Sequence, residues 1–151
     1  MTDPKRDDVL SAHHVMEYPY TRSTGPVVGR FLTGLRDRRI VGVRTTTGKV
    51  LVPPVEFDPD TSEAVTEQFV EVGPGATVTA WSWLEHPRPK QPLERPFAWA
   101  LVKLDGADTA MLHAVDAGTP ERMATGMRVR ARWIAVPTGM ITDIECFEPE
   151  P

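Results

Sequence analysis

The stretch FAWALVKLDGADTAMLHAV, residues 97–115, decides the fold that the sequence predicts. Two apolar segments, 97–104 and 109–115, lie on either side of Asp105-Gly106, a dipeptide that is typical of tight turns between antiparallel strands. The stretch therefore predicts a β-hairpin. Phe97 and Trp99 are two residues apart, so we expect both side chains on one face of its first strand.

Further strand-like segments lie on both sides of this hairpin, at 64–72, 75–86, 127–136 and 140–147. The clearest begins at Met127, where apolar residues alternate with Arg128, Arg130 and Arg132. A short helix is expected at 118–126, before the last two strands. About five main strands with this helix are typical of an OB-type barrel, and a β-sandwich is the alternative.

The N-terminal part has a different pattern. Residues 1–24 are polar and turn-rich, so we expect an extended arm. Residues 25–38 predict a helix, because a proline suits its first turn and apolar residues recur at helical spacing. Residues 39–54 predict a hairpin that ends at a double proline. The predicted organisation is an arm at 1–24, a helix with a hairpin at 25–63, and a barrel at 64–151.

Composition limits the classes of function. The chain has 151 residues, 17 basic and 21 acidic side chains, and a formal net charge of -4. This balance does not favour a nucleic-acid-binding domain, which is usually basic. The single cysteine, Cys146, excludes an intramolecular disulfide and a cysteine-rich zinc site. The sequence has no signal-peptide core and no apolar run of about 20 residues, so we expect a soluble, cytoplasmic protein without membrane contact.

Few residues suggest catalysis. The G-x-S-x-G and G-x-x-x-x-G-K-[ST] motifs are absent from the sequence. Cys146 is expected to be a small, partly buried apolar residue. For His113 we expect a hydrogen-bonded strand residue, with a general base as the alternative. His86 begins the proline-rich loop 86–96, and no nucleophile is evident for it to serve. We therefore predict no catalytic residue.

The aromatic residues have two interpretations. Trp81 and Trp83 share one face of a predicted strand, as Phe97 and Trp99 do on the next, and together they would form an aromatic ledge. The ledge is either core or an exposed surface for a ligand or partner. In the second case it could also stack the bases of a single-stranded nucleic acid, with the strand arginines along the phosphates. A solvated arginine face is the simpler interpretation.

Several longer stretches resemble one known family. They are GRFLTGLRDRRIVGVR at 29–44, GKVLVPP at 48–54, RPFAWALVKLDGADTAMLHA at 95–114, GMRVRARW at 126–133 and ITDIECFEP at 141–149. Together they resemble the acyl-CoA-associated OB-fold family once called domain of unknown function thirty-five. The similarity is greatest to the branch attached to an enoyl-CoA hydratase subunit of steroid side-chain degradation. It implies an N-terminal helix, a rubredoxin-like zinc ribbon and an OB barrel.

The family's zinc ligands are not present in this sequence. Aligned on GKVLVPP, the four cysteine positions are occupied by Arg44, Thr47, Asp58 and Thr61. Arginine and threonine are not zinc ligands, and one aspartate cannot hold the ion alone. We therefore predict a degenerate, cysteine-free ribbon with no bound zinc and no other bound cofactor. A salt bridge between Arg44 and Asp58 is our hypothesis for what replaces the metal.

The resemblance also implies a function. Family members associate with thiolase-like enzymes and are thought to help handle acyl-CoA. For this branch the implied reaction is retro-aldol cleavage of a steroid side-chain CoA thioester to propionyl-CoA and a 17-keto steroid. The chain would be a non-catalytic subunit in a hetero-oligomer built on a homodimer of the thiolase-like aldolase, with a MaoC-like hydratase as a possible further partner. A single-stranded nucleic-acid-binding protein is the alternative function.

Candidate binding residues follow from these interpretations. The expected partner-binding residues are Phe31, Leu32, Leu35, Trp81, Trp83, His86, Phe97 and Trp99. The expected CoA-binding residues are Arg88, Lys90 and Arg95 in the proline-rich loop, since basic side chains attract phosphates.

Overall fold

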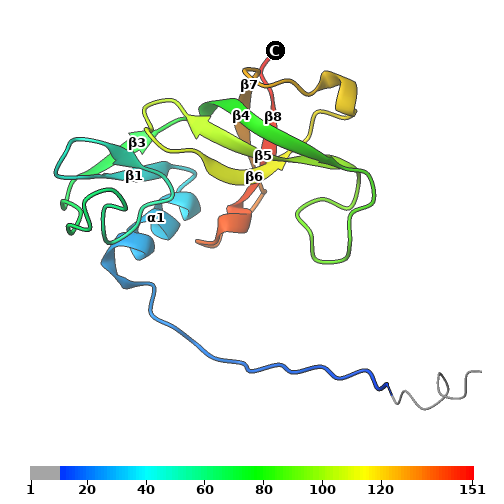
Figure 1. Ribbon diagram of the computed structural model, residues 1–151, viewed down its shortest axis with the longest axis horizontal. Coiled ribbons are helices and arrows are strands. Elements are labelled where there is room, and N and C mark those ends of the chain that lie inside the picture. The colour runs from blue at the N-terminus through cyan, green and yellow to red at the C-terminus, as the bar shows by residue number, and fades with distance from the viewer. Residues whose placement is uncertain (1–10) are drawn as a thin grey trace, which may run out of the picture.

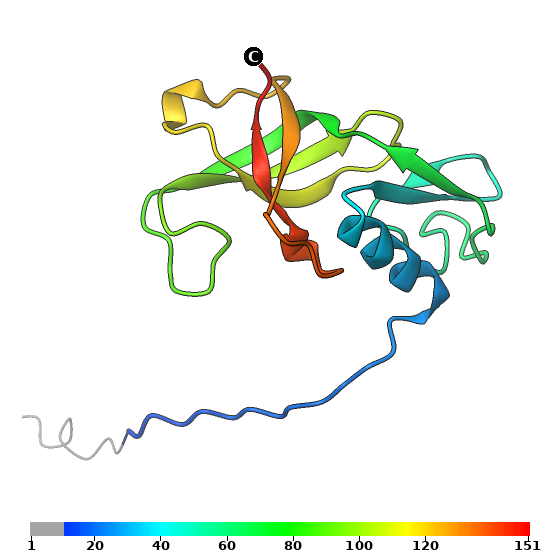
Figure 2. The ribbon, with the colours of Figure 1, turned by 180° about the vertical axis from the view of Figure 1, so that it is seen from behind.

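The computed structural model describes residues 11–151 (Figures 1 and 2). The first ten residues of the predicted arm lie outside the described residues. The elements are α1 Gly25–Arg36, β1 Ile40–Arg44, β2 Val50–Leu51, β3 Phe69–Val72, β4 Gly75–Leu84, β5 Phe97–Leu104, β6 Met111–Val115, β7 Arg128–Trp133 and β8 Ile144–Pro149, with 3-10 turns η1 Pro120–Arg122 and η2 Ile141–Asp143. No helix in residues 11–151 has the length and apolar character needed to cross a membrane.

Five strands close into a barrel in the order β4-β5-β6-β8-β7. Four of the five pairings are antiparallel, and β6 and β8 run parallel with a single partner pair, Val115 and Phe147. The turn η1 lies between β6 and β7, where the sequence predicts the short helix. The predicted mainly β fold with an N-terminal helix and an OB-type barrel is confirmed.

The hairpin at 97–115 forms as predicted. Strand β5 pairs with β6 from Ala98 opposite Val115 to Val102 opposite Met111. The connecting turn contains Gly106, whose φ of 90° lies in the region that residues with a Cβ rarely adopt. Because this hairpin supplies two adjacent strands of the barrel, it defines one whole side of it.

A second, three-stranded sheet with the order β2-β1-β3 lies beside the barrel (Figure 1). Strand β3 pairs with β1, from Ile40 opposite Val72 to Val43 opposite Phe69. The barrel strands therefore begin at Gly75, and the strand that precedes them belongs to the smaller sheet. In the sequence-based prediction the barrel starts at residue 64 and so includes β3. Sequence alone does not tell which of the two sheets this strand joins.

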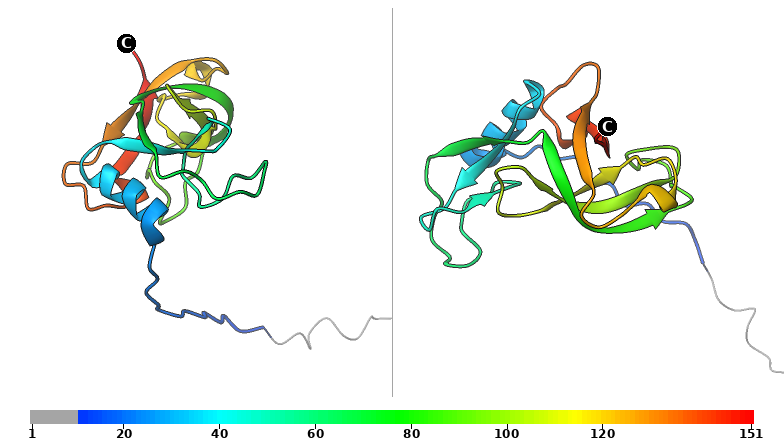
Figure 3. Two further views of the ribbon diagram at one scale, coloured as in Figure 1. Left: turned by 90° about the vertical axis from the view of Figure 1, so that its left-hand side faces the viewer. Right: turned by 90° about the horizontal axis from the view of Figure 1, so that it is seen from above.

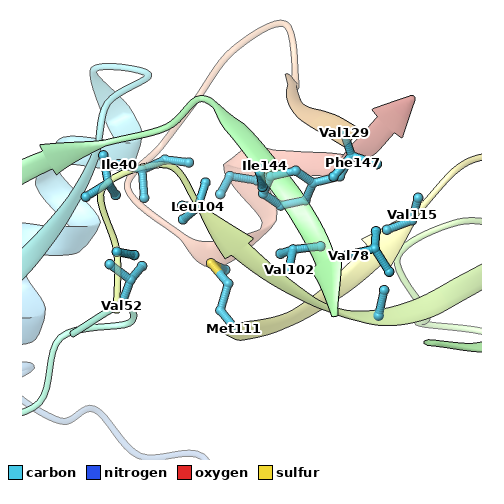
Figure 4. Packing of buried hydrophobic residues seen from close by; sticks show 14 of the residues in the cluster. Ile40, Val52, Val78, Val102, Leu104, Met111, Val115, Val129, Ile144 and Phe147 are labelled. Carbon is cyan, nitrogen blue, oxygen red and sulfur yellow. The ribbon is translucent and has the colours of Figure 1, made fainter. Parts of the chain in front are cut away.

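One apolar core runs through both sheets. Ile40, Val50, Val52 and Val72 from the small sheet belong to the same buried cluster as Leu104 and Met111 of the barrel hairpin and the other buried barrel residues (Figure 4). The small sheet is therefore not an independent domain, since its buried apolar side chains share one core with those of the barrel and of α1.

Hydrogen bonds join the small sheet to the turn of the barrel hairpin. The N–H of Val50 donates to Oδ2 of Asp108 at 2.7 Å, and the N–H of Asp108 donates to the carbonyl of Val50 at 2.9 Å. The hydroxyl of Thr109 accepts a hydrogen bond from the N–H of Val52 at 2.8 Å and donates one to the carbonyl of Val52 at 3.0 Å. The outer edge of β2 and the residue after it are thus hydrogen-bonded to the turn of the barrel hairpin.

Helix α1 packs its apolar stripe inward. Phe31 is 3% exposed and Leu35 is fully buried, while Leu32 is partly buried against the same core. The predicted docking role of Phe31 and Leu35 is wrong for this fold, because the core already covers them. After the helix, the guanidinium of Arg38 donates to the carbonyl of Ala135 at 2.9 Å, which ties α1 to the segment between β7 and β8.

The arm leaves the N-terminus of α1 as an extended trace that points away from the two sheets (Figure 3). Residues 11–24 are all exposed. This agrees with the extended arm that the sequence predicts.

We predict that Thr109→Val destabilises the protein by about 1–3 kcal/mol, because it keeps the shape of the side chain but leaves the N–H and carbonyl of the buried Val52 without their partner. Urea unfolding measures the change. The control is Thr125→Val, at an exposed position. Equal stability of the two variants would show that the contact between β2 and the barrel turn contributes nothing.

Candidate functional site

The candidate site is the outer face of β5 and β6, which are the second and third strands of the barrel in chain order. In OB folds this face and the loops beside it are the usual binding surface. Here the flanking segments are the proline-rich loop 85–96, between β4 and β5, and the segment 134–143, between β7 and β8. We call this surface the barrel face.

The barrel face is apolar and contains a cavity. Leu101 and Leu112 lie opposite each other across β5 and β6, and Leu112 is 61% exposed. A cavity of about 220 Å³ next to them is lined by Pro92, Trp99, Leu112, His113, Ile141, Thr142 and Ile144. Exposed apolar side chains around an aromatic residue are typical of surfaces that bind a partner or an apolar ligand.

The one ionisable group of the cavity is neutral. His113 is buried, and its Nδ1 accepts the N–H of Ala114 at 2.9 Å. Its ring meets Phe147 edge-on, with the ring centroids 5.4 Å apart. Burial lowers the pKa of His113, so the imidazole carries no charge at neutral pH. This matches the hydrogen-bonded strand histidine that the sequence predicts, and it leaves the cavity suited to an apolar group.

The predicted aromatic ledge does not form. Trp81 and Trp83 lie opposite Ala100 and Ala98, whereas Trp99 lies opposite Ser82. Directly opposed residues share a face, so the two tryptophans of β4 point to the other side of the sheet from Trp99. The cause is a register shift in β4 between Val78 and Ala80, which reverses the alternation of the residues that follow it.

The four aromatic residues therefore have separate environments. Trp83 packs against the main core, and Trp81 is at the surface. Phe97 is fully buried with Leu93 in a smaller cluster, so its predicted role as a partner contact is wrong. Among the four, only Trp99 lines the cavity of the barrel face.

The three arginines of β7 point outward as predicted, and each contacts carboxylates. Arg128 forms ion pairs with Asp105 and Glu150, and Arg130 with Glu148. Arg132 contacts three carboxylates, those of Asp116, Glu145 and Glu148. Their charges are thus matched within the chain, which removes the feature that favoured contact with the phosphates of a nucleic acid.

The basic residues of the proline-rich loop differ in their contacts. Arg95 is exposed and forms an ion pair with Asp116, which also contacts Arg132, so part of its charge is already matched within the chain. Burial alone would raise the pKa of Asp116, but hydrogen bonds from the two arginines lower it below its usual value. Arg88 and Lys90 are exposed, and neither forms an ion pair with any residue in the range 11–151. His86 is exposed at the start of the same loop.

Cys146 is buried in the smaller cluster beside Phe97. Burial raises the pKa of its thiol to about 12, and the nearby Arg132 only partly opposes this effect. The thiol is therefore protonated at neutral pH and acts as an apolar core residue, as the sequence predicts.

The segment that the sequence analysis interprets as a degenerate ribbon is held by polar contacts that were not predicted. Arg44 donates to the carbonyl of Gly48 at 2.8 Å and forms no ion pair with Asp58 among the described residues, so that hypothesis is wrong. Instead, Lys49 forms an ion pair with Asp60, and Thr46 donates to Glu63 at 2.7 Å. Both contacts join the turn at 44–49 to the turn at 58–63.

The residues at the positions that the resemblance aligns with zinc ligands do not suit a zinc ion. Asp58 is buried, and its Oδ1 accepts the N–H of Asp60 at 2.9 Å, while its Oδ2 has no hydrogen-bond partner. Thr47 and Thr61 are exposed. Residues 11–151 contain no group of three or more His, Cys, Asp or Glu side chains that could hold a metal ion. The ammonium group of Lys49 provides positive charge near Asp58 and Asp60, and this pairing raises the pKa of Lys49.

Asp143 shapes the segment beside the cavity, and the sequence analysis missed it. Its carboxylate accepts the backbone N–H groups of Thr138 at 2.9 Å, Gly139 at 2.6 Å and Met140 at 3.0 Å. Burial opposes ionisation, but these hydrogen bonds prevail and lower the pKa of Asp143. Asp143 lies three residues after Met140, which is the spacing of an acidic residue that caps the start of a helix. This spacing is visible in the sequence and could have identified Asp143.

We predict that Asp143→Ala lowers the free energy of unfolding by about 1–3 kcal/mol at pH 7, because three N–H groups lose a charged acceptor. The folded-state pKa of Asp143 is lowered, so its contribution is present above the unfolded pKa of about 3.9 and is lost as the pH falls below it. The difference between wild type and variant should therefore shrink on acidification. Urea unfolding at several pH values tests this, with Glu67→Ala as the exposed control. A difference that is independent of pH would contradict the assigned role of the carboxylate.

We also predict that the purified chain contains no stoichiometric zinc and that EDTA leaves its Tm unchanged, because the donor set at positions 44, 47, 58 and 61 is unsuited to the ion. Metal analysis by mass spectrometry and a thermal melt measure the two quantities. One zinc per chain, lost together with stability in EDTA, would contradict the prediction.

Comparison with known proteins agrees with the barrel geometry. Residues 69–133 match the family model described as "ChsH2, C-terminal OB-fold domain". A DUF35-family protein of unknown function from Sulfolobus solfataricus has a similar structure, with a TM-score of 0.63 and 16% identity over 84% of this chain and 85% of that chain. A chain of the structure described as "Ltp2-ChsH2(DUF35) aldolase" is similar with a TM-score of 0.58 and 22% identity over 80% of this chain and 91% of that chain. No curated protein matches. The resemblance inferred from the sequence is thus confirmed: residues 69–133 are similar to the ChsH2 C-terminal OB-fold domain, and the fold is similar to that of DUF35 proteins.

Proposed function

We propose that this chain is a non-catalytic accessory subunit that binds a thiolase-like aldolase through its barrel face. The observation that carries the proposal is the match of residues 69–133 to the ChsH2 C-terminal OB-fold domain family. A similar fold in the structure described as an Ltp2-ChsH2(DUF35) aldolase supports it, because there a DUF35 chain is named together with a second protein.

The geometry of the barrel supports the choice of surface. The arginines of β7 are matched by carboxylates of the same chain, whereas the barrel face presents Leu101, Leu112 and Ile141 to solvent around a cavity. Burial of such apolar side chains is the main favourable contribution to stable protein association. An apolar side chain of the aldolase would fill the cavity beside Trp99.

We further propose that the complex acts on a steroid side-chain CoA thioester that carries a β-hydroxyl group. The hydroxyl loses a proton and the bond between the α and β carbons breaks, which leaves a 17-keto steroid and the enolate of propionyl-CoA. The enolate then takes up a proton. The acid and base belong to the aldolase in this proposal, since the buried Cys146 and the neutral His113 are both parts of the core of this chain.

The remaining contributions of this chain would be binding and charge. Arg88 and Lys90 are exposed basic residues of the loop beside the barrel face that form no ion pair within residues 11–151, and in this proposal they attract the phosphates of CoA as the substrate approaches. The complex is proposed as a hetero-oligomer on an aldolase homodimer, with a MaoC-like hydratase as the enzyme that supplies the β-hydroxyl thioester.

A reconstitution experiment tests the proposal. The chain is mixed with a thiolase-like aldolase from the same genome, and release of propionyl-CoA from a β-hydroxy steroid-CoA thioester is measured. We expect little turnover by either protein alone and turnover by the mixture. An aldolase that reaches its full rate without this chain would contradict the proposal.

A substitution on the barrel face tests the docking surface. We predict that Leu112→Asp weakens binding of the aldolase at least about tenfold, because it places a charge in the apolar contact. Isothermal titration calorimetry measures the affinity. The control is Thr125→Asp, which adds the same charge at an exposed position between η1 and β7. Equal affinity of the two variants would exclude the barrel face as the docking surface.

A further inference from the structure

The segment 134–143, between β7 and β8, extends the apolar surface of the barrel face. It carries three large exposed apolar side chains, since Val136 is 74% exposed, Met140 57% and Ile141 42%. Ile141 also lines the cavity together with Leu112 of β6. The part of the segment before η2 is neither helix nor strand. The apolar surface therefore continues from two barrel strands onto an irregular stretch of chain.

The segment is longer than the connection requires. Strands β7 and β8 are antiparallel neighbours, and such strands can be joined by about 2–5 residues. The chain instead leaves β7 after Trp133 and returns at Ile144. Between these residues it lies beside α1, as Figures 1 and 2 show for η2. The extra length places apolar side chains at the surface next to the cavity, which a tight turn would not do.

An irregular segment usually weakens binding, because the partner must order it. Here the segment is already held in the free chain. The carbonyl of Ala135 accepts a hydrogen bond from the guanidinium of Arg38 at 2.9 Å. Gly139 packs against α1 so closely that an added Cβ would lie 3.4 Å from the carbonyl oxygen of Leu32. The side chains of the segment are therefore in place before a partner arrives.

Asp143 supplies most of the hydrogen bonds that hold the segment. Its side chain is fully buried, and its carboxylate accepts the N–H groups of Thr138, Gly139 and Met140. Its own N–H donates to the carbonyl of Met140 at 2.9 Å, and its own carbonyl accepts the N–H of Ile134 at 3.0 Å. One buried residue thus ties together the backbone at both ends of 134–140.

We infer that Asp143 is a positioning residue of the docking surface, which acts by holding Met140 and Ile141 where the partner contacts them. The inference rests on the proposed function, and the partner is the thiolase-like aldolase. Asp143 is buried, so it does not itself contact the aldolase. It strengthens association because the segment loses little freedom on binding.

Calorimetric titration of the full chain with the aldolase tests the inference. Asp143→Asn keeps the size of the side chain but removes the charged acceptor, and it should weaken binding at least about fivefold because the segment must then be ordered on binding. The titration is done where both chains are folded. A residue that only stabilises the fold would leave the affinity unchanged there, since the folded fraction stays close to one. Glu67→Gln, the same change at an exposed position, is the control.

A double-mutant cycle shows whether Asp143 acts through the segment. In a chain with Met140→Ser and Ile141→Ser, Asp143→Asn should cost less than about twofold, because the side chains that it positions are already gone. In a chain with Leu101→Ser, on β5, Asp143→Asn should keep its full effect. An equal cost of Asp143→Asn in both backgrounds would overturn the inference.

Gly139→Ala disturbs the same segment without changing the carboxylate. The φ of Gly139 is 92°, which alanine rarely adopts, so the segment must shift. This variant should weaken binding in the same way and should show the same dependence on Met140 and Ile141. It provides the test if Asp143→Asn is not fully folded. Wild-type affinity of either folded variant would overturn the inference. If the wild-type chain does not bind the aldolase, the proposed function fails, and the inference fails with it.

Discussion

The fold depends on one apolar core that the small sheet and the barrel share. Val50 and Val52 of the small sheet lie in the same buried cluster as Leu104 and Met111 of the barrel hairpin (Figure 4). The hairpin turn also supplies Asp108 and Thr109 as hydrogen-bond partners for the edge of β2. The small sheet can keep its shape without a metal ion, because burial and hydrogen bonds against the barrel hold it in place.

Much of this architecture is predictable from local patterns. The Asp-Gly turn, the alternation at 127–133 and the apolar stripe of the helix each identify an element, and the structure contains all of them. Properties that depend on register are not predictable in this way. A single shift between Val78 and Ala80 moves Trp81 and Trp83 to the other face of the sheet, and no feature of the sequence marks it.

Long-range contacts account for the other differences. The sequence pattern of α1 suggested a docking surface. In the structure the core covers the apolar stripe of the helix, and the segment 134–143 contacts the residues that follow α1. The pairing of Lys49 with Asp60, rather than of Arg44 with Asp58, depends on how two turns approach each other. The candidate site shows the same limit, since its cavity joins Trp99 and Leu112 to Ile141, which is far away in sequence.

The surfaces of the barrel have different characters, and this difference is the basis of the functional account. Carboxylates neutralise the arginine side, while the barrel face stays apolar and exposed. Hydroxyl-radical footprinting of the chain, alone and with the thiolase-like aldolase, tests this account most directly. The account predicts that labelling of Leu112 and Ile141 falls strongly in the complex, while that of the exposed Phe57, between β2 and β3, is unchanged. Equal labelling of Leu112 and Ile141 in both samples would contradict it.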